Sequence, residues 1–431
     1  MTGPTGKIEP QPWLTAPQTR KVMKALDADG GEARFVGGCV RDALLKRPVE
    51  DIDIATTEPP EKIMTLLENA GVKAIPTGIS HGTVTAVIGQ AAFQITTLRV
   101  DEETDGRRAK VAFTDDWEAD AARRDFTINT MSCTLDGDVY DPLSGMKDLA
   151  RRRVRFVGNA RQRIEEDVLR MLRYFRMHAA YGAPPPDISA LVACRALAPR
   201  LAELSGERVR DELLRILLGP DPASAVQLMR GERMLHYILP EAADVGVGEL
   251  RQLIWLEGPA VKIDSVAPDA LRRLAALLGA RVDGGEAAAA AKRLVLSKKQ
   301  TARLAAMVNP PFEIAPDMDE AGRARALSRM GEAAFLDAAL LAWAAERTVS
   351  SRQTSKRVQS WVALLESAAS KMPPPFPLTG RDVKNLGVPE GPRVGDLLEA
   401  VEEWWEDGAC KAKREDCLAE LKNRAEIPPP A

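Results

Sequence analysis

Apolar positions in the first third of the chain follow the short, alternating pattern of strands, interrupted by helical segments. The predicted strands are Ala33–Val36, Ile52–Ile54, Val84–Ile88, Phe93–Leu98, Met131–Leu135 and Val139–Tyr140. The last four form two hairpins, because the turn residues Gly89-Gln90 and Asp136-Gly137 join them in pairs. Helices are expected at Val40–Leu45 and, after Pro59-Pro60, as far as Ala70. The pattern predicts a small mixed α/β unit that ends near Asp148.

From about Asn159 onward the apolar positions recur at helical spacing. One stripe holds Ile164, Val168, Met171, Leu172, Phe175 and Ala179, and it predicts a helix with one apolar face. Further helices are predicted at Glu207–Leu218, Ala270–Leu278, Glu286–Leu296, Gln300–Met307, Arg323–Met330 and Glu332–Arg347. The stretch Pro373–Pro377 indicates a linker before a last, acidic helical tail. We therefore expect an α+β protein, a mixed-sheet unit followed by helices.

Composition and charge are typical of a soluble globular protein with several packed units. The 431 residues are 45% hydrophobic and 28% charged, and 59 Lys+Arg against 62 Asp+Glu give a net charge of −3. This length predicts about two to four units. Without a global positive charge, a nucleic-acid partner would have to bind local basic surfaces. Arg151–Arg176 offers one, with nine arginines and three acidic residues, although a solvated helix face would carry the same charges.

Cysteine and histidine usage argues against several kinds of site. The five cysteines form no CxxC pair and there are only three histidines, so a disulfide scaffold, a structural zinc site and a histidine-based metallohydrolase are disfavoured. The first residues carry charges and prolines where a signal peptide needs an apolar core. The apolar run Ala338–Ala345 is far shorter than the roughly 18 residues that cross a bilayer. We expect a cytoplasmic protein without a membrane partner.

A candidate phosphate site lies where the first predicted strand meets two glycines and a helix, in Phe35-Val-Gly-Gly-Cys-Val-Arg-Asp42. Gly37 and Gly38 allow the backbone to approach an anion closely, and the free N–H groups of the helix start would face it. Arg41 adds a cationic fork at the same end. The alternative is that Gly37 and Gly38 form an ordinary turn that binds no phosphate.

A candidate metal site follows in the next predicted strand. Asp51 and Asp53 are two positions apart, so a strand directs both carboxylates to the same face. Carboxylate oxygens suit Mg²⁺, and two such ions can stabilise an in-line phosphoryl transfer. An acidic pair of this kind is also common on solvated strands. Its spacing from the glycines, on adjacent elements, favours a combined phosphate and metal site.

Several motifs occur in an order that resembles one enzyme family. They are GGCVRD at 37–42, DID at 51–53, RRDFTIN at 123–129, DPLSGMKDL at 141–149 and EDVLR at 166–170. Together they resemble the class II tRNA nucleotidyltransferase and bacterial poly(A) polymerase family, within the polymerase-β-type nucleotidyltransferases. The resemblance covers residues 33–215, about two-fifths of the chain. It implies a mixed-sheet nucleotidyltransferase head followed by an all-helical neck, body and tail.

The resemblance also implies roles for the matched residues. Asp51 and Asp53 would be the catalytic pair that binds Mg²⁺. The residues that would hold the nucleotide are Gly37, Gly38, Arg41, Arg123, Arg124, Asp125, Asp167, Arg170, Arg173 and Arg176. Among these, Asp167 and Arg170 would form the protein template that selects CTP and ATP.

The chemistry of Asp167 and Arg170 suits a template. Three positions apart on one predicted helix, their side chains would lie next to each other. A carboxylate only accepts hydrogen bonds and a guanidinium only donates them, so together they can pair with a base edge. Cytosine and adenine carry an exocyclic amine beside a ring acceptor, whereas uracil and guanine invert that order. An ordinary ion pair between the two residues is the structural alternative.

Two further segments favour CCA addition within the family. Arg99–Phe113 is similar to a flexible element of enzymes that finish with A, and Leu378–Leu398 is similar to a C-terminal element of CCA-adding enzymes. We therefore expect template-independent addition of CCA to tRNA from CTP and ATP. Poly(A) synthesis and a non-catalytic RNA-binding relative are the alternatives, and the oligomeric state stays open. Gln94 stands where relatives often carry a carboxylate.

The same resemblance suggests a division of the chain into four parts. These are a catalytic head (1–148), a nucleotide-templating neck (149–220), a tRNA-binding body (221–371) and a tRNA-binding tail (372–431).

Overall fold

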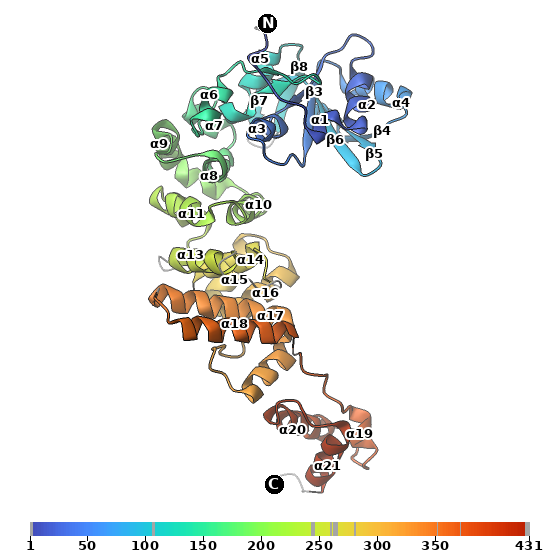
Figure 1. Ribbon diagram of the computed structural model, residues 1–431, viewed down its shortest axis with the longest axis vertical. Coiled ribbons are helices and arrows are strands. Elements are labelled where there is room, and N and C mark those ends of the chain that lie inside the picture. The colour runs from blue at the N-terminus through green and yellow to red at the C-terminus, as the bar shows by residue number, and fades with distance from the viewer. Residues whose placement is uncertain are drawn as a thin grey trace. The chain divides into compact units, whose positions relative to one another are not determined.

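The computed structural model describes residues 3–105, 108–242, 246–258, 261, 266–279, 282–350, 352–370 and 372–426. The chain divides into two compact units, Met1–Ile238 and Leu239–Ala431, called here the N-terminal and C-terminal units. The described strands all belong to the N-terminal unit, in the blue-to-teal part of the chain in Figure 1. The expected α+β class is therefore confirmed. The finer division into head, neck, body and tail stays a prediction.

A mixed sheet forms the framework of the N-terminal unit. In spatial order its strands are β1 (Gly6–Lys7), β10 (Asp138–Tyr140), β9 (Ser132–Cys133), β2 (Ala33–Val36), β3 (Ile52–Thr56), β6 (Ala91–Thr97), β5 (Thr83–Ile88) and β4 (Lys73–Gly78). Strands β3 and β6 run parallel, with Asp53 opposite Gln94. The other neighbours are antiparallel. The side chains of Phe35, Ile54 and Ile95 are fully buried at its centre.

Both predicted hairpins are present in this sheet. β5 pairs with β6 and β9 pairs with β10, each in antiparallel register. The pattern did not predict β4, which contains Pro76, or the separate hairpin of β7 (Arg99–Asp105) and β8 (Arg108–Phe113). These strands lack the alternation of apolar and polar residues on which a prediction from sequence depends.

Helices fill the rest of the N-terminal unit. They are α1 (Pro12–Thr15), α2 (Pro17–Leu26), α3 (Gly38–Leu44), α4 (Pro60–Asn69), α5 (Trp117–Ala122), α6 (Gly145–Ala150), α7 (Ala160–Glu166), α8 (Arg170–Tyr181), α9 (Ile188–Leu197), α10 (Gly206–Leu217), α11 (Pro222–Gly231) and α12 (Met234–Ile238). Short 3₁₀ turns occur at Ile79–His81, Thr127–Asn129 and Ala198–Glu203. Helices α3 and α4 begin and end within about two residues of the predicted bounds.

The apolar stripe that predicted one continuous helix is divided between α7 and α8. Asp167 lies between them in an extended conformation, with φ −149° and ψ 107°. Its carboxylate accepts a hydrogen bond from the main-chain N–H of Leu169 at 3.1 Å, an interaction that competes with helical hydrogen bonding. Ile164, on α7, and Met171, on α8, are both buried. The apolar contacts are therefore satisfied on both sides of the break, and the periodicity did not reveal it.

The C-terminal unit is helical in its described parts. Its helices are α13 (Gly246–Leu256), α14 (Ala270–Leu278), α15 (Gly284–Arg293), α16 (Lys298–Val308), α17 (Glu320–Val349), α18 (Ser355–Ser370), α19 (Gly380–Lys384), α20 (Pro392–Asp407) and α21 (Arg414–Ala425). Gly331 interrupts α17 with φ 75° and ψ 164°, a conformation that glycine adopts without steric cost. This kink separates the two helices predicted at Arg323–Met330 and Glu332–Arg347.

Buried ion pairs connect four elements of the C-terminal unit. Glu257, just after α13, accepts hydrogen bonds from Arg272 at 2.8 Å and Arg273 at 2.6 Å, both on α14. Asp337, on α17, accepts from Arg272 at 3.0 Å and from Arg303, on α16, at 2.9 Å. Asp337 is 3% exposed. Removing one partner of such a network leaves the others charged and unpaired in a poorly solvated place.

We therefore expect Asp337→Ala to lower the free energy of unfolding of the C-terminal unit by about 3 kcal/mol or more. Chemical unfolding followed by tryptophan fluorescence would measure this, because Trp343 and Trp361 are buried in the same unit and stack at 5.7 Å. Asp317→Ala is the matched control, since the Asp317 side chain is 78% exposed in its pair with Arg357. Equal stability losses in the two variants would contradict the prediction.

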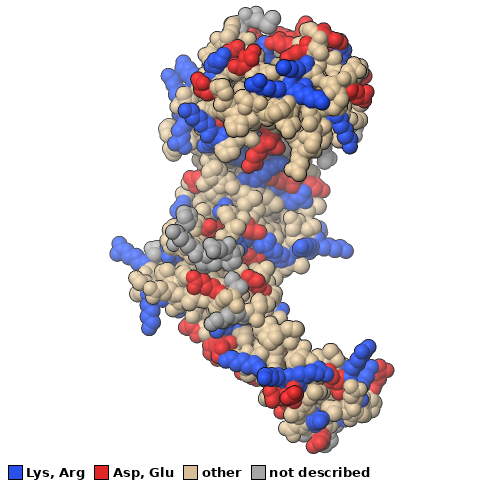
Figure 2. Space-filling view, turned by 45° about the vertical axis from the view of Figure 1, so that its right-hand side comes forward, with Lys and Arg blue, Asp and Glu red and all other residues tan. Residues whose placement is uncertain are grey.

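The surface carries charges of both signs. On the face shown in Figure 2, basic and acidic side chains are interspersed over the visible surface, in agreement with the net charge of −3. Within the described part of the chain, no helix has the length and apolar character needed to cross a membrane.

Candidate active site

The turn between β2 and α3 places glycine where another residue would be strained. Gly37 has φ 73° and ψ −123°, a conformation that L-residues with a side chain avoid. A Cβ atom at this position would also lie 3.3 Å from the Nη1 atom of Arg124. The close approach of backbone and guanidinium depends on the missing side chain. The turn therefore brings the glycine pair next to the RRD motif.

The residues predicted from the sequence line one open cleft of ≈ 840 Å³ in the N-terminal unit. They are Gly37, Gly38, Arg41, Asp51, Asp53, Arg123, Arg124, Asp125, Asp167, Arg170, Arg173 and Arg176. The structure thus brings together segments more than a hundred positions apart in the chain, while the role of each residue stays a prediction. Other charged or polar residues also line the cleft, among them Gln94, Arg99, Asn129 and Arg215. Arginines outnumber carboxylates among its described lining residues, which suits a polyanionic ligand.

Two carboxylates line the cleft where β3 begins. Asp51 is exposed and Asp53 is half-buried. Burial raises the pKa of Asp53 above its ordinary value, and the charge of Asp51 adds to this rise while Arg124 opposes it. Gln94, opposite Asp53 on β6, adds a neutral amide to the same cleft. The Asp51–Asp53 pair is therefore a site where a bound cation would relieve both burial and mutual repulsion.

The donor chemistry of this pair fits a hard divalent cation such as Mg²⁺. Mg²⁺ prefers oxygen ligands and commonly uses one or two carboxylates together with water and substrate phosphates. Among the described residues, no group of three or more His, Cys, Asp or Glu side chains is arranged to hold a metal ion. A cation at Asp51 and Asp53 would therefore complete its coordination with oxygens from outside the protein.

Arg41 lies in the cleft but its guanidinium is already engaged within the protein. It donates to Asn129 at 2.6 Å, to Tyr181 at 2.6 Å and to Asp42 at 2.7 Å. Only 6% of the residue is exposed, and its guanidinium stacks on the Tyr181 ring. These contacts connect α3 to the end of α8. The geometry supports a structural task for Arg41 besides the predicted contact with a triphosphate.

The RRD motif is held by three partners, of which the sequence analysis did not single out Asp120. Asp120 accepts hydrogen bonds from Arg123 at 2.8 Å and from Arg124 at 2.9 Å. Asp125 is buried and accepts from Asn129 at 3.1 Å and from Arg173 at 2.8 Å. One signal for Asp120 was present in the sequence, because it precedes the two arginines by three and four positions, the spacing of neighbours on a helix.

The predicted template residues do not pair with each other. Both carboxylate oxygens of Asp167 accept from Arg208 of α10, each at 3.0 Å. Arg170 instead donates to Glu166 at 2.6 Å and to the main-chain oxygen of Arg123 at 3.4 Å. The expectation that Asp167 and Arg170 stand on one helix is wrong, because the helix breaks at Asp167. Both still face the same cleft. No local pattern marked Arg208 as a partner.

The buried aspartates beside the arginines predict a loss of stability in acid. Although burial raises the pKa of Asp125, the charge and hydrogen bond of Arg173 hold it below its ordinary value. A lowered pKa in the folded state gives stability that is present above the unfolded value, about 3.9, and is lost as the pH falls through the folded value.

Asp125→Asn is therefore expected to lower the thermal unfolding midpoint at neutral pH, with the difference from wild type shrinking as the pH falls below about 4. Parallel thermal unfolding of the two proteins from pH 7 to pH 3 measures this. A difference that does not depend on pH would contradict the linkage.

Comparisons with known proteins agree with this geometry. The model of the poly(A) polymerase head domain matches residues 33–155, and the model described as a probable RNA and SrmB-binding site of polymerase A matches residues 187–245. The mitochondrial CCA tRNA nucleotidyltransferase 1 of Danio rerio is 34% identical over 395 residues, covering 90% of this chain and 87% of that protein. The Homo sapiens protein of that name is 33% identical, covering 91% and 86%.

A solved structure shows the same fold over almost the entire chain. The CCA-adding enzyme of Bacillus stearothermophilus, in complex with CTP, superimposes with a TM-score of 0.76 and 27% identity, covering 97% of this chain and 98% of that one. Taken with the ordered motifs and the cleft, these likenesses show that the chain belongs to the CCA tRNA nucleotidyltransferase family.

Proposed function

We propose that the protein adds CCA to the 3′ ends of tRNA, using CTP and ATP and releasing pyrophosphate. The observation that carries this proposal is the position of Asp51 and Asp53 in one cleft with Gly37-Gly38 and the arginines of the RRD motif. A metal-binding carboxylate pair beside a cationic phosphate site is the arrangement needed for nucleotidyl transfer. The named relatives are CCA tRNA nucleotidyltransferases and CCA-adding enzymes.

The acidic pair would act at the reacting phosphate. Asp51 and Asp53 would hold Mg²⁺, which when bound supplies positive charge to the attacking and leaving oxygens. The primer 3′-hydroxyl would attack the α-phosphorus of CTP twice and then of ATP, and pyrophosphate would leave. Arg124 lies close to both Gly37 and Asp53, so its charge can neutralise a phosphate placed between them.

Base selection would take place at the junction of α7 and α8. Arg208 holds the carboxylate of Asp167 from one side, and Glu166 holds the guanidinium of Arg170. A carboxylate and a guanidinium fixed in this way present an acceptor and a donor to a base edge. Their separation by a helix break, instead of one helical turn, leaves each one free to be oriented by its own partner.

The tRNA would be held through its backbone. Local arginines suit this task because phosphate contacts dominate RNA affinity and require no base readout. The segment 187–245 matches a model described as an RNA-binding site. A cytoplasmic location remains a prediction, and the two relatives above are mitochondrial by name.

Nucleotide incorporation into tRNA lacking its terminus tests the proposal, with each radiolabelled nucleotide supplied separately and then in pairs. CTP by itself should add two residues, and ATP by itself should add one A to a tRNA that ends in CC. UTP and GTP should add nothing. A long A tail would show poly(A) synthesis, the activity named in the matching head-domain model. No incorporation of any nucleotide would exclude both activities.

A further inference from the structure

Asp120 is a buried carboxylate that contacts two arginines of the cleft wall, Arg123 and Arg124. It lies on α5 and is 3% exposed. A buried carboxylate needs paired hydrogen-bond donors, because burial of an unpaired charge is costly. The hydrogen-bond donors to the Asp120 carboxylate come from Arg99, Arg123 and Arg124, which all line the cleft.

The two oxygens of Asp120 have different partners. Oδ1 accepts from Nε of Arg123 at 2.8 Å and from the main-chain N–H of Arg99 at 3.3 Å. Oδ2 accepts from Nε and Nη2 of Arg124 at 3.3 Å and 2.9 Å. One carboxylate therefore contacts Arg99, where β7 begins, as well as both arginines of the RRD motif. These arginines line the cleft that holds Asp51 and Asp53.

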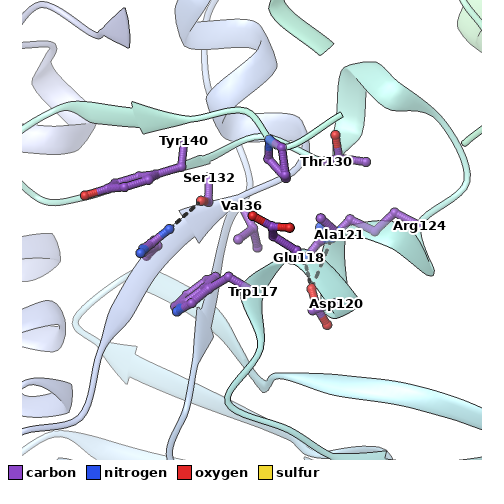
Figure 3. Close-up of a pocket in the computed structure, with 11 residues that line it drawn as sticks. Val36, Trp117, Glu118, Asp120, Ala121, Arg124, Thr130, Ser132 and Tyr140 are labelled. Atoms are coloured by element: carbon purple, nitrogen blue, oxygen red, sulfur yellow. Dashed lines mark hydrogen bonds and ion pairs between the residues drawn. The ribbon is translucent and has the colours of Figure 1, made fainter. Parts of the chain in front are cut away.

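Helix α5, which carries Asp120, is held against the sheet by the side chain of Trp117. Figure 3 shows Asp120 and Arg124 on one side of a small cavity of ≈ 30 Å³, with Trp117 beside them. Trp117 packs on Val36, from β2, and donates its indole N–H to Glu32 at 3.0 Å. Arg124 lines both this cavity and the cleft. Asp120 lines the cavity only, and it reaches the cleft through its contacts with Arg123 and Arg124.

We propose that Asp120 is a positioning residue for nucleotide binding: it fixes the guanidinium groups of Arg123 and Arg124, and the main chain of Arg99, as one preorganised cationic wall for the triphosphate. Without the carboxylate the two guanidinium groups would repel each other and turn toward water. Nucleotide binding would then have to order them again. The inference rests on the proposed function, since it assigns the triphosphate to this wall.

The charge of Asp120 is consistent with this task. Burial raises its pKa, but the charges of Arg124 and Arg123 outweigh burial and hold the pKa below its ordinary value. The carboxylate therefore stays ionised at neutral pH, next to both arginines.

Asp120→Asn tests the proposal, because an amide has the same size but one acceptor oxygen and no charge. We expect the KM for both CTP and ATP to rise about tenfold or more, as for the loss of one hydrogen bond between charged groups. The kcat should fall less, and the KM for tRNA should not change. A residue that only stabilises the fold would not separate KM from kcat in this way. Asp187→Asn is the matched control, because Asp187 is similarly buried and paired with Arg153.

A double-mutant cycle shows whether Asp120 acts through its neighbour. In an Arg124→Ala background, Asp120→Asn should raise the nucleotide KM by a clearly smaller factor than in wild type, since coupled residues are not additive. If Asp120→Asn does not fold, Asp120→Glu keeps the charge but moves the carboxylate by one methylene, and it should raise the same KM values.

Unchanged nucleotide KM in the folded variants, or fully additive effects with Arg124→Ala, would overturn the inference and leave the proposed function standing. A wild-type protein that incorporates neither CTP nor ATP would instead remove the proposed function itself.

Discussion

Asp53→Ala is expected to abolish nucleotide incorporation while tRNA binding survives. Asp53 lies half-buried in β3, and it lines the same cleft as Asp51, Gly37 and Arg124. Without its carboxylate, Asp51 by itself remains to hold a cation, and the charge at the reacting phosphate is no longer neutralised. Losing one preorganised electrostatic contact in an active site typically costs about 10²- to 10³-fold in kcat, and loss of a metal ligand should reach at least the upper figure. The tRNA affinity should change little, because an aspartate repels phosphates, whereas cationic contacts with the RNA backbone supply most of such affinity.

Incorporation of CTP into tRNA lacking CCA measures the rate, and gel-shift titration measures tRNA binding. Asp138→Ala is the control, because Asp138 stands in β10 of the same sheet, where it pairs with Lys7 at 3.2 Å. It should retain near wild-type activity. Full activity in Asp53→Ala would refute the metal assignment. Loss of tRNA binding together with activity would point to misfolding or to a role for Asp53 in RNA binding.

Asp167→Ala is expected to relax the choice among the four nucleotides. The Asp167 carboxylate is oriented by Arg208 at 3.0 Å and by the N–H of Leu169 at 3.1 Å. These contacts leave acceptor lone pairs for a donor on a base edge. A site that hydrogen-bonds its substrate can reject an unsuitable one by about 10⁴-fold or more. If Asp167 is one of the two template side chains, as we propose, its removal should therefore lower discrimination against UTP and GTP by about 10²-fold.

The measurement is the ratio of kcat/KM for CTP to that for UTP, and for ATP to that for GTP, on the corresponding tRNA ends. Asp211→Ala is the control, because Asp211 lies on the same α10 helix as Arg208 but its side chain is 55% exposed in a pair with Arg210. Its ratios should match those of wild type. Unchanged ratios in Asp167→Ala would move base selection away from the α7–α8 junction.

Short-range patterns were sufficient to predict much of the N-terminal unit. The β5–β6 and β9–β10 hairpins follow from alternating residues joined by turn residues, and both are formed. The Gly-Gly turn was predicted from residue type, and Gly37 has a positive φ as such a turn requires. Asp51 and Asp53 reach the same cleft as the glycines because β2 and β3 are neighbouring strands.

The periodicity of apolar residues could not predict contacts between segments that are distant in the sequence. The stripe from Ile164 to Ala179 predicted one helix, whereas Asp167 interrupts it with a side chain that bonds to the backbone and to Arg208. Arg41 has the residue type of a phosphate ligand, yet it is enclosed by Asn129 and Tyr181.

The sequence by itself determined the residue types, the order of the motifs and the turns and hairpins that bring glycine and aspartate together, because these depend on neighbours within a few positions. Only the tertiary structure decided which partner each charged side chain has. Arg208 lies forty-one positions from Asp167, and Asn129 lies eighty-eight positions from Arg41. A charged group pairs with whichever opposite or polar group the packed fold places within hydrogen-bond distance, and that distance is set by the packing of whole elements.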